Sequence, residues 1–196
     1  MDPDASTTRV GWRSPVTAPR GCSVRCFHRW TTTYAVTEDI EVPDGDANGV
    51  IVAQGGAFGG WPLYLVAGVP VHCYNLRGLT QIKAAAAEPL SPGHHQVRVE
   101  FAYDGGSLAK GADTTPYVDG MASGTARQEA SIPKVFSDDE TLDVGVDYAT
   151  SVSDDYTPET SRFTGTVTWV QLDQGLDDHC HLISPEDQLT VAMARQ

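Results

Sequence analysis

Glycine-bounded apolar runs in Gly49–Asn75 constrain this chain more than any other feature. Val50–Ala53 is apolar on both faces and rich in β-branched residues, as expected for a strand buried inside a sandwich. Trp61–Val66 and Pro70–Tyr74 are separated by the turn-sized step Ala67-Gly68, which predicts a β-hairpin. Three such runs in succession must be buried together, so this region predicts the centre of a β-sheet protein.

Strand and turn signals continue along the chain at a spacing of about ten residues. Tyr34–Val42 predicts a first strand, and the alternation of apolar and polar residues in Gln96–Tyr103 predicts a half-buried antiparallel strand. Asp119-Gly120 predicts a second hairpin. This spacing predicts an all-β fold, an antiparallel two-sheet sandwich with a lectin-like jelly-roll topology. The remaining predicted strands are Leu79–Ala84, Thr115–Val118, Met121–Glu129 and Phe163–Leu172.

The two ends of the chain depart from this pattern. Residues 1–32 have no periodicity and contain scattered prolines, so we expect a disordered basic leader followed by one β-sandwich domain at 33–196. Near the other end, Ser184 and Pro185 are suited to the N-cap and the first position of a helix. They predict a short C-terminal helical turn.

The net charge of −13 limits the partners that the chain can have. Residues 1–30 hold five arginines and two aspartates, a net +3, so the remaining residues carry −16. So acidic a domain is unsuited to nucleic acid and to anionic membrane surfaces. There is no apolar run of membrane-spanning length, and the leader lacks the apolar core of a secretory signal. We therefore expect a cytoplasmic chain without nucleic-acid or membrane partners, its four cysteines reduced.

Acidic and histidine-rich stretches raise the question of a metal. Ser137–Asp147 and Asp154-Asp155 offer carboxylates, but they lack the loop spacing of a calcium site, and a solvated acidic loop is the favoured interpretation. The run from His179 to His181 offers soft ligands, yet a closed zinc site needs four of them. We predict no metal site and no cofactor in this chain. His94-His95, in a turn before a strand, predicts an exposed pair.

Aromatic and amide side chains gather on neighbouring predicted strands. Lectin-like jelly rolls stack sugars on aromatic rings and bind sugar hydroxyls through Asn or Asp. Because successive strand residues face opposite sides, half of these side chains must belong to the core instead. The candidate ligand-binding residues are Trp61, Tyr64, Tyr74 and Asn75, with core packing as the alternative interpretation.

Seven segments resemble a known domain when they are taken in order. They are Ile40–Gly45, Gly49–Gly56, Phe58–Trp61, Phe101–Gly106, Tyr117–Gly120, Asp139–Gly145 and Arg162–Gly165. Together they resemble the β-sandwich C-terminal domain that follows the catalytic domain in bacterial, especially actinobacterial, arylsulfatases. The resemblance covers the chain from about Tyr34 to Gln196, while residues 1–30 resemble nothing in that family.

The resemblance implies a domain without the family's chemistry. Arylsulfatases hydrolyse sulfate esters with a formylglycine made in a Cys/Ser-x-Pro-x-Arg motif, beside a divalent metal, usually calcium, in the catalytic domain. Here Cys22–Cys26 has Val24 in place of the proline and Cys26 in place of the arginine. The implied function is a non-catalytic C-terminal domain, inactive alone and without catalytic residues, whose partner is a sulfatase catalytic domain. The alternative hypothesis is a free-standing carbohydrate-binding, lectin-like module, for which the acidic charge favours a neutral glycan.

Overall fold

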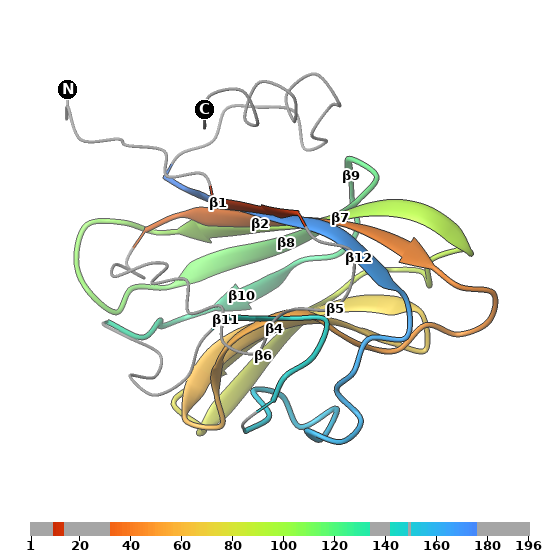
Figure 1. Ribbon diagram of the computed structural model, residues 1–196. Coiled ribbons are helices and arrows are strands. Elements are labelled where there is room, and N and C mark those ends of the chain that lie inside the picture. The colour runs from red at the N-terminus through yellow and green to blue at the C-terminus, as the bar shows by residue number, and fades with distance from the viewer. Residues whose placement is uncertain (1–9, 14–31, 134–141, 149, 176–196) are drawn as a thin grey trace.

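The computed structural model describes residues 10–13, 32–133, 142–148 and 150–175, and they form two antiparallel β-sheets packed face to face (Figure 1). These ranges contain no helix, and hence none that could cross a membrane. The larger sheet contains β1 (Val10–Arg13), β2 (Tyr34–Val42), β7 (Gly93–Tyr103), β8 (Ala112–Val118), β9 (Met121–Ala122), β10 (Ala126–Gln128) and β12 (Thr166–Gln174). The smaller contains β3 (Gly49–Gly56), β4 (Gly59–Val66), β5 (Val69–Leu76), β6 (Thr80–Ala85) and β11 (Leu142–Val144).

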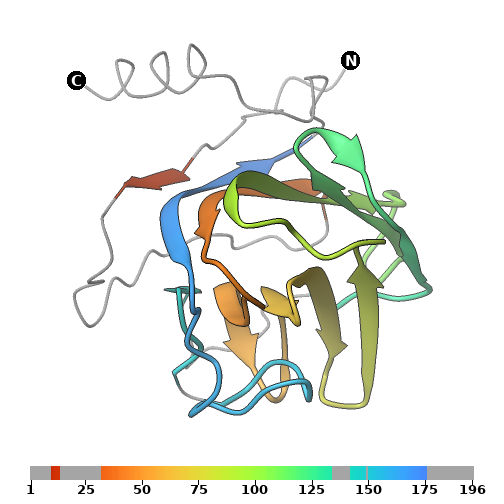
Figure 2. The same cartoon turned by 90° about the vertical axis from the view of Figure 1, so that its right-hand side faces the viewer.

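The strand order confirms the predicted antiparallel two-sheet sandwich. The seven-stranded sheet runs β1-β12-β2-β7-β8-β10 with β9 paired to β8, and the five-stranded sheet runs β11-β3-β4-β5-β6. Figure 2 shows the two sheets as layers, with the β3–β4 and β5–β6 hairpins ending at the same side of the molecule. Ala67-Gly68, Arg77-Gly78 and Asp119-Gly120 each have two successive positive φ angles. That backbone form is a type I′ turn, whose twist suits the flanking strands.

The apolar core lies between the sheets and is built around stacked aromatic rings. Tyr34 lies 5.8 Å from Trp61 and 4.7 Å from Phe101, and Phe101 lies 5.5 Å from Tyr74, all measured between ring centroids. All four side chains are buried. The apolar residues of the alternating segment Gln96–Tyr103 face this core, as predicted. Rings from β2, β4, β5 and β7 therefore join both sheets into one core.

Two titratable side chains also face the interior. Glu38 of β2 lies opposite Val97 of β7 on one side and Val170 of β12 on the other. Both valines are core residues, and Glu38 is fully buried. Neither of its carboxylate oxygens has a hydrogen-bond partner on another described residue. His72 of β5 is buried with its ring stacked on that of Trp61 at 6.0 Å, and its Nε2 has no partner among the described residues. Buried ionisable groups without partners favour their uncharged forms.

The described strands differ from the predicted ones at three places. Val10–Arg13, within the leader that the sequence predicts to be disordered, pair with β12 as a strand. The predicted strand Met121–Glu129 is divided into β9 and β10 near Gly124, where a Cβ would lie 2.1 Å from the carbonyl oxygen of Ala85. β11 was not predicted. Leader residues 1–9 and 14–31 and the predicted C-terminal helical turn lie outside the described residues.

Candidate functional site

Of the four predicted ligand-binding residues, Trp61 and Tyr74 belong to the core between the sheets. Trp61 is 0% exposed and Tyr74 is 1% exposed. The Tyr74 hydroxyl accepts a hydrogen bond from the backbone N–H of Ile132 at 2.8 Å, and burial raises the pKa of Tyr74 well above its ordinary value. Neither ring presents a face to a ligand, so core packing, the alternative interpretation, describes both.

Tyr64 and Asn75 point to the opposite, outer face of the five-stranded sheet, but they are also buried. The Tyr64 hydroxyl donates to Asp155 Oδ2 at 2.6 Å and lies 3.0 Å from Ser153 Oγ. Asn75 Nδ2 donates to the carbonyl of Val152 at 2.9 Å. All four predicted residues are therefore inaccessible, and Tyr64 and Asn75 instead hold the loop that crosses this face.

The covering loop, described over residues 147–148 and 150–161, is organised by a buried carboxylate. Asp147 is 2% exposed and its Oδ2 accepts hydrogen bonds from the Tyr156 hydroxyl at 2.6 Å and from the backbone N–H of Val152 at 3.1 Å. Beneath the loop, Val152 and Tyr156 pack with Tyr64 and Cys73 in a second apolar cluster. Burial raises the pKa of the Cys73 thiol to about 12, so it is protonated.

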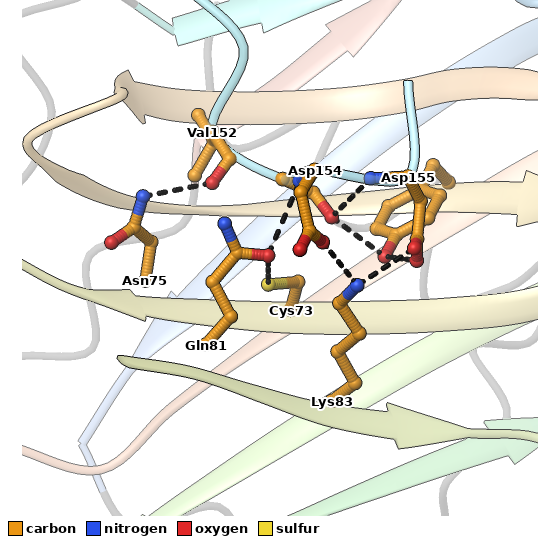
Figure 3. A network of polar contacts seen from close by, with 9 residues as sticks. Cys73, Asn75, Gln81, Lys83, Val152, Asp154 and Asp155 are labelled. Atoms are coloured by element: carbon orange, nitrogen blue, oxygen red, sulfur yellow. Dashed lines mark hydrogen bonds and ion pairs between the residues drawn. The ribbon is translucent and has the colours of Figure 1, made fainter. Parts of the chain in front are cut away.

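Polar groups that reach solvent gather where this loop meets β6. Lys83 Nζ lies 2.5 Å from Asp154 Oδ1 and 2.7 Å from Asp155 Oδ1 (Figure 3). Gln81 Oε1 accepts hydrogen bonds from the Asp154 backbone N–H at 3.2 Å and from Cys73 Sγ at 3.6 Å. The side chain of Asp154 is 72% exposed, that of Asp155 33% and that of Lys83 31%. We call Gln81, Lys83, Asp154 and Asp155 the Lys83 patch.

The charges of the Lys83 patch stabilise one another. Burial disfavours the charged form of Lys83, but hydrogen bonds to Asp154 and Asp155 outweigh it and raise the pKa of the ammonium. Burial likewise opposes the charge on Asp155, but hydrogen bonds from Lys83 and Tyr64 lower the pKa of that carboxyl. The patch therefore places the Lys83 ammonium against the side chains of Asp154 and Asp155. Such a set can bind hydroxyl groups, because it offers both donors and acceptors.

The acidic residues that suggested calcium have other roles in the described part of the chain. Asp154 and Asp155 bind Lys83, and Asp147 binds its own loop. Among the described residues, His, Cys, Asp and Glu form no group of three or more that could hold a metal. The acidic residues 137–141 and the run from His179 to His181 lie outside the described residues.

Two exposed apolar residues lie on hairpin turns of the same five-stranded sheet. Phe58, in the β3–β4 turn, is 81% exposed, and Leu79, in the β5–β6 turn, is 84% exposed. Asn75 joins their turns, since its Nδ2 donates to the Ala57 carbonyl at 3.2 Å and its Oδ1 accepts from the Gly78 N–H at 2.7 Å. The N–H of Ala57 also donates to Thr150 Oγ1 of the covering loop at 2.9 Å. Phe58 is thus exposed on a firmly held turn.

Sequence reasoning missed Gln81, Lys83 and Phe58. Lys83 falls inside the predicted strand Leu79–Ala84 at an outward position, which is a usable signal. Its partner Asp154 is 71 residues away, and no local pattern connects the two. Phe58 stands among four glycines, a composition typical of a turn, where an apolar residue has no core to face.

The histidine pair differs from the prediction of two exposed side chains. His94 is 62% exposed and its Nε2 lies 2.9 Å from both carboxylate oxygens of Asp39. The side chain of His95 is only 13% exposed, with Nδ1 2.8 Å from Asp119 Oδ2 and Nε2 2.9 Å from the Ser91 carbonyl oxygen. The prediction is wrong for His95, because that residue lies opposite the core residue Ile40 in β2.

No family model and no curated protein matches this chain. Several solved structures share its fold. The CBM40 domain of a Ruminococcus gnavus IT-sialidase, bound to α2,3-sialyllactose, aligns with a TM-score of 0.56 at 12% identity, over 88% of this chain and 96% of that one. Domains LG4-5 of the mouse laminin α1 chain align with a TM-score of 0.54 at 15% identity, over 78% of this chain and 39% of that one.

A third structure places the fold inside a larger enzyme. The NanB sialidase of Streptococcus pneumoniae aligns with a TM-score of 0.52 at 10% identity, and this chain covers 24% of it, with 81% of this chain aligned. Identities this low establish shared architecture and not shared ligands. The described part of this chain is therefore a β-sandwich of the lectin-like type.

Proposed function

We propose that this chain is a non-catalytic carbohydrate-recognition module whose ligand binds at the Lys83 patch. The observation that carries the proposal is the exposed set of Lys83, Asp154 and Asp155, whose donors and acceptors are held in place on the outer face of the five-stranded sheet. Sugar hydroxyls are bound by such charged hydrogen-bonding groups. The lectin-like fold supports the proposal, because it also occurs in a sialidase CBM40 domain solved with a bound sialyllactose.

The resemblance to arylsulfatase C-terminal domains stays a prediction, with neither a family model nor a curated match behind it. The two hypotheses differ in the partner they require. A recognition module binds glycans by itself, whereas a sulfatase accessory domain binds a separate catalytic domain. Purified protein on a glycan array, beside a pull-down against sulfatase catalytic domains, distinguishes them.

The site is tested by a matched pair of variants. Lys83→Met removes the ammonium of the patch, while Lys110→Met removes an exposed ammonium on the β7–β8 loop of the other sheet. We expect Lys83→Met to weaken glycan binding about tenfold or more, as loss of a charged hydrogen bond does, and Lys110→Met to leave it unchanged. Circular dichroism checks that both variants fold. Equal binding by the two variants would overturn this site, and an array without any bound glycan would overturn the function.

A further inference from the structure

The Lys83 ammonium occupies the position between Asp154 and Asp155 that a bound cation would take. It lies 2.5 Å from one carboxylate and 2.7 Å from the other. Calcium requires six to eight oxygen ligands, and the described residues offer no cluster of three or more metal-binding side chains. A glycan can therefore meet fixed charges at this patch without a divalent cation.

The charge of this surface is unsuited to anionic glycans. Lys83 is already bound by two carboxylates, and the one further cation in the adjoining described turns is Arg77, so the set has no net positive charge. The whole chain carries −13. A sialylated or sulfated glycan would bring like charge to this surface, which is unfavourable without an excess of cations. A neutral glycan brings hydroxyls alone.

Phe58 supplies the apolar half of such a site. Its turn is bonded to Asn75 and to Thr150, and Thr150 belongs to the loop that carries Asp154 four residues later. The turn that carries Phe58 is therefore bonded to the loop that carries Asp154. The Phe58 ring is 81% exposed on a turn whose backbone is held by these bonds, so its face is open to a sugar.

We infer that the Lys83 patch and Phe58 together bind a neutral oligosaccharide without a divalent cation. Phe58 stacks on the C–H face of a sugar ring at one end of the oligosaccharide, while Asp154 and Lys83 bind hydroxyls of a ring further along it. The strand register separates Phe58 from Lys83 by two strands and more than three residues, roughly 15 Å, which is the span of several sugar rings. Gln81 and Lys83 are two residues apart on β6, a separation of roughly 7 Å. The patch is therefore long enough to contact more than one hydroxyl group. The inference rests on the proposed function and names its ligand class.

The test uses an array on which each neutral oligosaccharide is printed beside its sialylated and sulfated derivatives. The full chain is applied in calcium chloride and in EDTA. We expect stronger binding to the neutral member of each set and the same binding in both buffers. Preference for the charged members, or binding lost in EDTA, would overturn the inference while leaving glycan recognition intact.

A second pair of variants tests the stacking ring. Phe58→Ser removes it, and Met121→Ser removes a side chain of similar exposure, 74%, on β9 of the other sheet. We expect Phe58→Ser to weaken binding of the array's neutral oligosaccharides about tenfold and Met121→Ser to have no effect. Equal affinities in the two variants would show that Phe58 is no part of the site. If Lys83→Met still abolished glycan binding in that case, the proposed function at the Lys83 patch would stand without Phe58.

Discussion

At the scale of single residues, Asn75 joins three segments that are separate in the sequence. Its amide binds the β3–β4 turn, the β5–β6 turn and the covering loop, and it is 1% exposed. Asn75→Ala would leave the Val152 carbonyl and the Gly78 N–H without these partners. We expect a loss of about 2–4 kcal/mol in the free energy of unfolding, measured by urea denaturation.

The control for this prediction is Thr80→Ala, a change at an exposed position of the adjacent strand β6. It should alter the free energy of unfolding by no more than about 0.5 kcal/mol. If Asn75→Ala were equally mild, the amide would not be the structural link that its contacts indicate.

The candidate site shows what single residues could and could not predict. Alternation along β4 correctly requires that Trp61 and Tyr64 face opposite sides. It cannot predict that Tyr64 is also buried, because the loop that covers it includes Asp155, 91 residues away. The exposure of a strand residue depends on segments distant in sequence, so the sequence offers Tyr64 as a ligand-binding candidate although the covering loop buries it.

At the scale of elements, one hairpin turn carries strain that a substitution can relieve. Ala67, the first central residue of the β4–β5 turn, has a φ of 49°. A Cβ destabilises this left-handed conformation, and Asn tolerates it better than Ala does. Ala67→Asn should raise the free energy of unfolding by roughly 0.5–1 kcal/mol. Ala102→Asn, at an exposed position of β7, is the comparison and should give no gain.

The covering loop is a second element whose stability can be measured, through Cys73. This thiol is fully buried beneath the loop and reacts when the loop opens. Tyr156→Phe removes the hydroxyl that donates to Asp147 Oδ2, so we expect the labelling rate of Cys73 to rise about tenfold. Peptide mass spectrometry separates Cys73 from the other cysteines. Tyr148→Phe, in the same loop but 61% exposed, should leave the rate unchanged.

Long strands were predictable and short ones were not, for a physical reason. Tyr34–Val42 was predicted with the bounds that β2 has, because it combines β-branched residues with a dense turn cluster behind it. β1 and β11 have four and three residues, too few to show a period, and each is an edge strand. They exist because β12 and β3 offer unpaired backbone groups, and that information lies elsewhere in the chain.

At the scale of the whole molecule, Glu38 and His72 make the stability of the sandwich depend on pH. Burial lowers the pKa of His72 from its ordinary value of 6.5 to about 3. Below pH 6.5 the unfolded chain therefore binds a proton that the folded chain does not, and stability falls as the pH falls toward 3. Burial raises the pKa of Glu38 well above 4.5, although Arg98 and its own backbone oppose the shift. Above pH 4.5 the folded chain keeps a proton that the unfolded chain releases, so stability falls as the pH rises.

These opposite slopes should cancel between pH 4.5 and 6.5 and give a plateau of stability there. Above pH 6.5 the slope of Glu38 remains alone, at up to about 1.4 kcal/mol per pH unit. Glu38→Gln removes that group, so its free energy of unfolding should be flatter than that of the natural chain on the alkaline side. His72→Gln should be flatter on the acid side, and the exposed His94→Gln is the control. Urea denaturation at pH values below 4.5 and above 6.5 measures how the free energy of unfolding changes with pH. A packing cost of the substitution that does not depend on pH leaves these slopes unchanged. Parallel curves for Glu38→Gln and the natural chain above pH 6.5 would mean that Glu38 is ionised in the folded sandwich, its charge balanced by Arg98 or by water or a cation between the sheets.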